Sequence, residues 1–225
     1  FIRKRKRDKS NMNSLNHVAF IMDGNGRWGA KKKRGRNYGH LKGVETVKKI
    51  VNASIENKIP VVTFYVFSSE NWKRPKEEIK YLFGLIKSYF TNELEKIISE
   101  GIKINILGEI LALPKDVKLV LKETILKTKK NKKIIVNLAI NYGSKNEILL
   151  AAKKTRKNLT IKNFENSLYT KQLPNPDILV RTGGHCRLSN FLLWQMAYTE
   201  IYFLKKLWPD FSPIDLKKII KDFKR

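Results

Sequence analysis

The sequence predicts a single-domain α/β protein in which a central, mostly parallel β-sheet is flanked by helices. Short apolar runs rich in β-branched and aromatic residues alternate with longer segments of helical periodicity, and this order is typical of a parallel sheet covered on both faces. The 225 residues suit one such domain, and no repeat or low-complexity linker divides them. Ligands of such sheets bind beyond the carboxyl ends of the strands, so the loops that leave those ends are the first candidates for function.

The first half of the chain is expected to form two strands and two helices. A buried strand is predicted at 17–22, where an apolar run ends abruptly at an acid. Apolar residues at helical spacing predict a helix over 44–58, and a β-branched and aromatic run predicts a strand at 61–67. A proline opens and a glycine ends the long helix expected over 75–101.

The second half continues the alternation. Strands are predicted at 102–108 and 132–143, on either side of a helix over 114–130. Helical patterns fill roughly 145–171, and the strand predicted at 177–184 ends in a glycine turn.

The last part of the chain combines an apolar run with an amphipathic helix. Residues 189–203 are apolar nearly throughout, so we expect the whole run to be buried. A helix is predicted over 212–225, with a serine in the N-cap position.

Charge limits the classes of partner. The 47 basic and 20 acidic side chains give a formal charge of +27, which predicts attraction to the phosphates of a nucleic acid, an anionic lipid or a diphosphate substrate. A general bias of the composition toward lysine explains most of this charge equally well. Residues 1–16 begin with a cationic stretch without periodicity and are expected to form a disordered basic arm, while 17–225 form the folded domain.

Cysteine content and hydropathy exclude further classes. Cys186 is the one cysteine, so no disulfide can form within the chain, which agrees with a reducing compartment. No apolar run reaches the roughly 20 residues that a membrane-spanning helix requires. We therefore expect a protein that is cytoplasmic or peripheral to a membrane. The sequence starts at Phe1 rather than at methionine, so we also expect a trimmed N-terminus that has lost any targeting segment.

Three polar loops follow predicted strands and are expected to converge on one site. They are DGNGR at 23–27, SSENWKR at 68–74 and RTGGHCR at 181–187. Because the carboxyl ends of parallel strands lie at the same edge of a sheet, residues from all three loops are expected to share a single cavity.

The first loop spells the G-x-G-x-x-G pattern at 24–29, but its context disfavours a dinucleotide site. The bulky Arg27 and Trp28 lie within the spacing, and the next acid, Glu45, lies in a helical pattern rather than at the end of a second strand. A Walker-type phosphate loop is disfavoured too, because no Gly-Lys-Ser/Thr follows.

The same loop is better suited to an anion held together with a metal ion. Its glycines let backbone N–H groups approach an anion, which nearby cations can neutralise: Arg27, Arg34, Arg36 and His40. Asp23 is then a candidate ligand for Mg²⁺, which proteins often hold with one or two carboxylates and the substrate phosphates. The alternative for Asp23 alone is a turn-forming or helix-capping acid.

The other two loops repeat this chemistry. Arg181, Arg187 and Ser189 surround a glycine turn and form a second candidate anion site. His185 is a candidate base or ligand, or simply a solvated loop histidine, and Cys186 has no positioned partner in the sequence. Side chains of the middle loop either bind substrate or only shape a turn: Ser68, Glu70, Asn71, Trp72 and Arg74. Two phosphate-binding loops and one metal acid indicate an enzyme that joins two phosphorylated substrates.

The ordered set of motifs resembles the cis-prenyltransferases, also called undecaprenyl or polyprenyl diphosphate synthases. From about residue 17 to the C-terminal helix the chain shows, in order, MDGNGRW, R-x-x-G-H, FSSENW-x-RP, NYG, RTGG, R-x-SNFLLWQ and LWPDF. The resemblance implies a homodimeric or heterodimeric α/β fold with a hydrophobic tunnel. It also implies a Mg²⁺-dependent enzyme that adds isopentenyl diphosphate units to an allylic diphosphate such as farnesyl diphosphate, with cis double bonds.

The same resemblance implies roles for individual residues. Asp23 matches the metal-binding acid, and Glu200 matches a second acid near the metal. The loop from Gly24 through Gly26 to Arg27 and Trp28, with Arg36 and His40, resembles the cradle of the allylic diphosphate. Isopentenyl diphosphate is expected at Arg181, Arg187 and Ser189, positioned by Ser68, Glu70, Asn71, Trp72 and Arg74. Asn25 and Ser68 are implied to help remove its proton.

Two apolar faces are candidates for the tunnel wall, and ordinary core packing explains each residue equally well. One helical face carries Ile79, Leu82, Phe83 and Ile86, and one strand face carries Val62, Phe64 and Val66.

The chain departs from the family pattern at three places. His185 stands where the family usually has an acid, and Cys186 where it often has a histidine. Gly29 replaces a common alanine, and the Arg-x-Gly that many members carry near the C-terminus is absent from the residues up to Arg225. The resemblance as a whole favours a homodimeric enzyme. The missing Arg-x-Gly leaves open the alternative of a catalytic subunit that needs a different partner subunit.

A basic nucleic-acid-binding protein is the less favoured hypothesis, because the aromatic residues lie in apolar runs rather than on an exposed stacking platform. The basic arm is also expected to favour anionic membranes near the lipid product.

Overall fold

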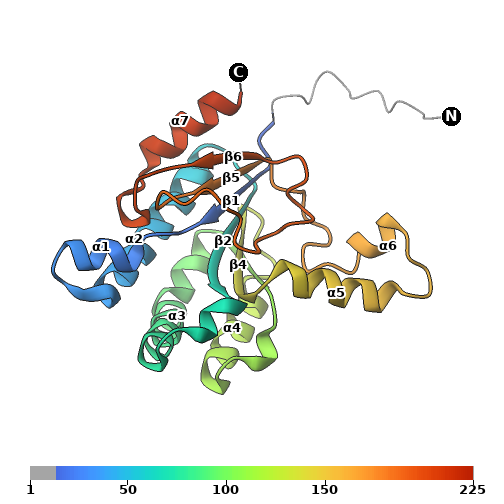
Figure 1. Ribbon diagram of the computed structural model, residues 1–225, viewed down its shortest axis with the longest axis horizontal. Coiled ribbons are helices and arrows are strands. Elements are labelled where there is room, and N and C mark those ends of the chain that lie inside the picture. Colours follow the sequence, from blue (N-terminus) through green and yellow to red (C-terminus); the bar gives the residue numbers. More distant parts are fainter. Residues whose placement is uncertain (1–13, 225) are drawn as a thin grey trace.

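A central parallel sheet organises the computed structural model, which describes residues 14–224 (Figure 1). Six strands of these residues pair in the order β3-β4-β2-β1-β5-β6, and each neighbouring pair is parallel. This confirms the predicted fold class. The strands are β1 (His17–Ile21), β2 (Val61–Ser68), β3 (Ile102–Leu107), β4 (Ile134–Tyr142), β5 (Ile178–Arg181) and β6 (Glu200–Phe203).

Most of the long helices cover one face of the sheet, and the turns of residues 188–196 cover much of the other. The long helices are α2 (Gly35–Glu56), α3 (Lys76–Ser99), α4 (Lys115–Thr128), α5 (Ser144–Thr155) and α7 (Pro213–Phe223). Side chains of α2, α3, α4 and α7 share one large core with alternate residues of the strands, such as Phe20 and Phe64. On the other face, Ala19 and Ile21 pack with the buried residues Phe191, Leu192 and Met196. The helices α5 and α6 (Ile161–Glu165) extend to one side of the sheet (Figure 1).

Between β1 and β2, the predicted and observed helices differ because two helices pack through their backbones rather than through apolar side chains. The loop after β1 was expected to be a turn, but α1 (Asn25–Lys31) forms there and α2 begins at Gly35, earlier than the predicted 44. A Cβ atom at Gly39 would overlap the carbonyl oxygen of Asn25, so these two helices pack backbone to backbone. Because glycine makes this contact, no apolar periodicity marks it.

The helical pattern predicted over 145–171 is divided in the structure. The helices α5 and α6 are separate, and Thr160 caps α6 by accepting a hydrogen bond from the backbone N–H of Asn163. A polar N-cap of this kind favours a new helix start.

The prediction that all of 189–203 is buried was wrong. Phe191, Leu192 and Met196 are buried, but Tyr198 is 98% exposed and three of the four residues of β6 are exposed. Since β6 is the last strand of the sheet, one of its edges has no neighbouring strand among residues 14–224.

The predicted arm lies mostly outside the described residues. Of residues 1–16, the structure describes 14–16, where Leu15 is buried and the backbone N–H of Asn16 donates to the carboxylate of Asp177 at 2.7 Å. The expected membrane affinity of the arm therefore remains a prediction. Every helix within residues 14–224 is too short or too polar to cross a lipid bilayer.

A buried histidine joins β1 to β2 at the amino end of the sheet. The His17 ring is fully buried, with Nδ1 2.7 Å from the carbonyl oxygen of Pro174 and Nε2 2.7 Å from the hydroxyl of Thr63. The side-chain amide of Asn137 donates to the same hydroxyl at 3.0 Å, so Thr63 donates in turn to Nε2 of a neutral imidazole. Burial lowers the pKa of His17 to about 4, although the Pro174 carbonyl and Asp177 oppose this effect.

The His17 pKa predicts acid sensitivity of the fold. The unfolded chain binds a proton near pH 6.5 and the folded chain only near pH 4, so stability falls as pH decreases through this window, by about 3 kcal/mol between pH 7 and pH 4. Urea unfolding of the wild type and of His17→Gln at several pH values measures the effect. The wild type is expected to lose more stability than the variant, and parallel pH profiles of the two proteins would contradict the assignment.

Candidate active site

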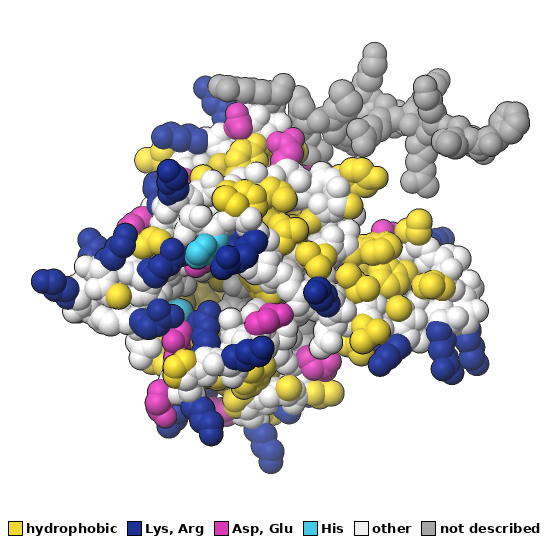
Figure 2. Space-filling view, in the orientation of Figure 1, with side chains coloured by type: hydrophobic (Ala, Val, Ile, Leu, Met, Phe, Trp, Pro, Cys, Tyr) yellow, Lys and Arg dark blue, Asp and Glu magenta, His cyan; other side chains and the backbone are white. Residues whose placement is uncertain are grey.

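A polar cavity of about 790 Å³ opens at the carboxyl edge of the sheet. Figure 2 shows it as a hollow with Lys and Arg side chains along much of its rim. All three predicted loops contribute to it, because β2, β1 and β5 are adjacent and end side by side. Of the predicted site residues, those that line it are Asp23, Gly24, Asn25, Gly26, Arg27, Arg36, His40, Ser68, Glu70, Asn71, Arg74, Arg181, Arg187 and Ser189.

A buried guanidinium connects the loops after β1 and β5. Arg181 is 4% exposed, and its Nη2 donates to Oδ2 of Asp23 at 3.0 Å. Its Nη1 donates to the hydroxyl of Ser189 at 2.7 Å and to the carbonyl oxygen of Arg187. The other oxygen of Asp23 accepts from Nη2 of Arg27 at 3.0 Å. The Asp23 carboxylate thus lies between two cations at the mouth of the cavity.

Two arginines and a histidine surround a carboxylate that the sequence analysis missed. Glu78, in the first turns of α3, accepts from Arg36 at 3.3 Å and from Arg74 at 3.0 Å, and lies 3.4 Å from Nε2 of His40. Burial raises the pKa of Glu78, but the hydrogen bond and charge of Arg36, with Arg74 and His40, outweigh it and leave the pKa below its usual value. Burial, followed by the charge of Arg74, lowers the pKa of His40.

The sequence held only a weak signal for Glu78. It follows Arg74 by four residues, a spacing that brings two side chains together on one helical face, but the partners Arg36 and His40 come from α2. Their approach depends on tertiary packing, which the spacing does not reveal.

Buried polar atoms at the cavity have no hydrogen-bond partner within residues 14–224. They are Oδ1 of Asn25, Nε2 of His40, which faces Glu78 without hydrogen-bond alignment, and Nε of Arg181. An unsatisfied buried donor or acceptor costs about 1–3 kcal/mol, so these atoms favour a polar ligand or ordered water in the cavity.

An apolar cavity of about 110 Å³ adjoins the polar one between α2, α3 and the sheet. The two share lining residues at their boundary: Met22, Asn25, His40, Val66 and Leu82. A further cavity of about 60 Å³ continues from it, sharing Val47, Tyr89, Phe90 and Leu138, and reaches the ion pair of Lys48 and Glu93.

The candidate tunnel residues divide between this cavity and the core. Val66, Leu82 and Ile86 line the apolar cavity. Ile79, Phe83, Val62 and Phe64 are buried core residues outside its lining.

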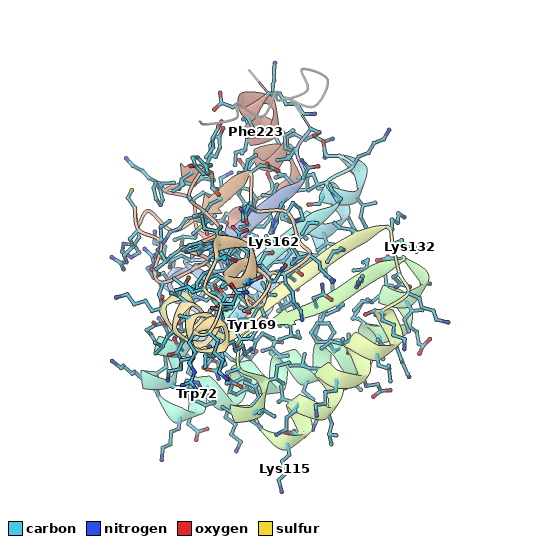
Figure 3. The ribbon with its side chains drawn as sticks, turned by 90° about the vertical axis from the view of Figure 1, so that its right-hand side faces the viewer. Trp72, Lys115, Lys132, Lys162, Tyr169 and Phe223 are labelled. Carbon is cyan, nitrogen blue, oxygen red and sulfur yellow. The ribbon has the colours of Figure 1, made fainter. Side chains whose placement is uncertain are left out.

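Three predicted site residues lie outside the polar cavity. Trp28 stacks on Tyr38, and its indole N–H donates to Asp210 at 2.7 Å. The indole N–H of Trp72 donates to Oδ1 of Asn141 at 2.8 Å. In Figure 3, Trp72 lies at the carboxyl edge of the sheet and Lys132, just before β4, at the amino edge. Direct substrate contact by either tryptophan remains a prediction.

Glu200 lies at the other end of the sheet from Asp23. It begins β6, where it pairs with Ile178, which in turn pairs with Val18 near the start of β1. From Val18 to Ile21 the strand rises about 10 Å at about 3.3 Å per residue, and Asp23 lies beyond that end. The described protomer therefore does not bring Glu200 to the cavity, and its role as a metal ligand remains a prediction.

The residues of the cavity fit a metal ion that is held mainly by substrate. Residues 14–224 contain no cluster of three histidine, cysteine or acidic side chains that could hold an ion alone. Asp23 provides one carboxylate at the cavity mouth, and Mg²⁺ is commonly bound by one or two carboxylates together with phosphate oxygens. Neither His185 nor Cys186, the departures from the family pattern in the loop after β5, lines the cavity.

Comparison with known sequences gives consistent matches over most of the chain. A family model described as a putative undecaprenyl diphosphate synthase matches residues 21–225. An isoprenyl transferase of Helicobacter pylori is 44% identical over 224 residues, which cover 94% of this chain and 94% of the relative. An isoprenyl transferase of Clostridium tetani is 42% identical over 217 residues, covering 92% of this chain and 85% of the relative.

Solved structures show the same architecture. Lavandulyl diphosphate synthase from Lavandula x intermedia, crystallised in complex with dimethylallyl diphosphate, superposes with a TM-score of 0.89 at 29% identity, covering 93% of this chain and 94% of that chain. A probable undecaprenyl diphosphate synthase from Campylobacter jejuni gives a TM-score of 0.81 at 35% identity, covering 95% and 96%.

The cations of the cavity predict that it binds inorganic diphosphate. Arg187 is exposed and lines the cavity, so Arg187→Met is expected to weaken binding about tenfold, since a charge-assisted hydrogen bond contributes about 1.5–3 kcal/mol. Isothermal titration calorimetry measures the affinity. Arg156→Met, at the exposed C-cap arginine that follows α5 and does not line the cavity, is the matched control. Equal affinities of the two variants would show that the anion binds elsewhere.

Proposed function

The chain belongs to the undecaprenyl diphosphate synthase, or cis-prenyltransferase, family and is a prenyl transferase, and on this premise we propose that it elongates an allylic diphosphate with isopentenyl diphosphate. The proposed reaction is a Mg²⁺-dependent, sequential condensation that gives a polyprenyl diphosphate with cis double bonds.

The observation that carries the proposal is the junction of the polar and apolar cavities. Five residues line both of them, so a ligand with an anionic head and a hydrocarbon tail can place its head among the cations and its tail between α2 and α3. We propose that this apolar space, with the cavity beyond it, is the start of the product tunnel. Transfer of hydrocarbon from water to such a space is favourable by about 0.8 kcal/mol per buried CH₂.

The allylic diphosphate is proposed to bind at the N-terminus of α1. Gly24 and Gly26 are buried there, and Gly24 has a φ of 113°, a conformation that glycine adopts readily. A Cβ atom at Gly26 would collide with the guanidinium of Arg36, so glycine lets this cation approach the backbone. Arg27 and His40 complete the lining of this part of the cavity.

Isopentenyl diphosphate is proposed to bind in the same cavity, at Arg181, Arg187 and Ser189. Ser68, Asn71 and Arg74 also line the cavity and would orient this substrate. Holding both reactants in line removes much of the entropic barrier, worth about 7–11 kcal/mol in ideal cases.

Proton removal is assigned to the boundary between the cavities. Asn25 lines both cavities, and its buried Oδ1 has no partner within the described residues, so this atom is free to accept a hydrogen bond from a reacting group. Ser68 lines the polar cavity nearby and is the second candidate for moving the proton.

Asp23 would hold Mg²⁺, which would stabilise charge on the departing diphosphate. Both oxygens of Asp23 accept hydrogen bonds from arginines. The exposed Arg27 is free to turn toward the diphosphate, whereas the buried Arg181 stays in place and keeps the carboxylate oriented.

The proposal is tested by incubating the protein with farnesyl and isopentenyl diphosphates, with and without Mg²⁺, and measuring the chain length of the extracted lipid. Asp23→Asn is expected to lower turnover by about 10²–10³-fold or more, the range for losing one electrostatic stabiliser. Asp116→Asn, at an exposed acid of α4 outside the cavity, is the control. Near-normal turnover in a folded Asp23→Asn variant would refute the proposed role.

We also propose that two copies of the chain associate through the apolar surface beside β6. Exposed apolar side chains of this region are Ile161, Trp194, Tyr198, Ile201 and Phe203. Figure 2 shows a large group of hydrophobic side chains on the side of the molecule where α5 and α6 lie. Exposed apolar surface next to a free strand edge is typical of a protein interface.

Tyr198→Glu is expected to convert a dimer into a monomer. The side chain is 98% exposed in the single chain, so a charge there costs little in the monomer but is buried in the proposed dimer. Sedimentation velocity measures the mass, and Leu119→Glu, at an exposed leucine of α4, is the control. A wild type that sediments as a monomer at micromolar concentration would exclude this dimer.

A further inference from the structure

The segment between β2 and α3 is held in place by contacts of its side chains, because its own residues are not buried. This segment is the short 3₁₀ helix η2 (Ser69–Lys73), which contains no buried residue. Its flanking and internal residues Ser68, Asn71 and Arg74 nevertheless line the polar cavity. One anchor is the Trp72 ring, which packs against the core residues Phe67 and Phe83 at 5.3 and 5.5 Å between ring centroids, and the polar contacts of the segment determine the rest of its position.

Two asparagines make these polar contacts, Asn141 near the end of β4 and Asn190 in a turn after β5. Nδ2 of Asn190 donates to Oε1 of Glu70 at 2.8 Å, and Oδ1 of Asn190 accepts from the backbone N–H of Lys145 at 2.8 Å. Oδ1 of Asn141 accepts from the indole of Trp72 at 2.8 Å, while its Nδ2 donates to the carbonyl oxygen of Glu109 at 2.9 Å. Each amide uses both ends, so its orientation is determined.

Both asparagines adopt a backbone conformation that most residues avoid. The φ angle is 61° at Asn190 and 49° at Asn141. Asparagine and aspartate tolerate this left-handed region better than other residues with a side chain. The neighbouring Ser189 also has a positive φ, 50°, and its hydroxyl accepts from the buried Arg181. The same short turn therefore presents one side chain to the anion site and the next to Glu70.

We propose that Asn190 and Asn141 are positioning residues that hold η2 over the cavity, and that the Asn190–Glu70 bond couples the loop of Arg187 and Ser189 to the loop of Ser68, Asn71 and Arg74. The inference rests on the proposed function, since it assigns these loops to isopentenyl diphosphate. Trp72, which lies outside the cavity, then acts through Asn141 rather than by touching substrate, whereas Glu70 lines the cavity and is held there by Asn190.

The charge of Glu70 supports a hydrogen bond in which the amide of Asn190 donates and the Glu70 carboxylate accepts. Burial raises the pKa of this carboxyl, but hydrogen bonds outweigh burial, the one from Asn190 first among them, and leave the pKa below its usual value. Glu70 is therefore an ionised acceptor facing the amide donor of Asn190.

Asn190→Asp tests the coupling with the smallest change of shape. Aspartate keeps the acceptor for Lys145 and tolerates the positive φ, but it sets a carboxylate against Glu70. The KM for isopentenyl diphosphate is expected to rise about tenfold, with a denaturation midpoint close to that of the wild type. Adding Glu70→Gln to this variant supplies an amide donor to the new carboxylate, so the double variant is expected to recover most of the lost KM.

Hydrogen exchange of residues 69–74 without substrate gives a readout that does not depend on activity. Exchange is expected to be faster in Asn190→Asp than in the wild type and slower again in the double variant. Trp72→Phe removes the indole donor to Asn141 and is also expected to raise the exchange rate of residues 69–74. This variant replaces Asn190→Asp in the test if Asn190→Asp fails to fold. Asn92→Asp, at an exposed site of α3, is the matched control.

The outcomes separate this inference from the proposed function. A wild type that elongates no allylic diphosphate refutes the proposed function, while exchange still decides whether the asparagines hold η2. An active Asn190→Asp variant with unchanged KM and unchanged exchange overturns the inference. Faster exchange with unchanged KM, or a double variant no better than Asn190→Asp, overturns the coupling between the loops.

Discussion

The buried ion pair of Arg181 and Asp23 is the interaction on which the site depends. Arg181 ends β5, Asp23 follows β1, and the same guanidinium binds the turn at Ser189. Breaking a buried pair by removing one partner typically costs about 3–5 kcal/mol, because the remaining charge is left without compensation. Asp23 is thus a structural partner of Arg181 and, in the proposed reaction, the acid that would hold a metal ion at the cavity mouth. This dual role answers why a carboxylate begins a loop that otherwise gathers cations.

The distribution of charge around this pair explains how a strongly basic chain can be selective. Arginines at the carboxyl edge of the sheet surround a concave cavity, and Glu78 holds Arg36 and Arg74 close to His40. Apolar space begins directly beside them. Such a junction suits a small amphiphile with a diphosphate head, whereas nucleic-acid binding by charge alone needs no adjoining apolar cavity. The rest of the +27 charge is spread over the chain, as a compositional bias would produce.

Sequence patterns predicted most strands and long helices because the central strands are buried on both faces and read as continuous apolar runs. They also predicted that three loops meet, since parallel strands end at one edge. They failed where tertiary contacts decide. Glycine packing between α1 and α2 leaves no periodic signal, the partners of Glu78 come from two helices, and apolar composition over 189–203 cannot distinguish a core from an exposed sheet edge. Motif matching placed Glu200 and Trp72 at the site. The strand register determines the position of Glu200, and a hydrogen bond to Asn141 helps to determine that of Trp72.

A crystal structure with Mg²⁺, isopentenyl diphosphate and an unreactive thio-analogue of farnesyl diphosphate tests the central claim most directly. The account predicts one diphosphate at the N-terminus of α1, the other beside Arg181 and Arg187, the ion on Asp23, and the farnesyl chain between α2 and α3. Ligand density outside this cavity, or an Asp23 carboxylate turned away from both diphosphates, would contradict it.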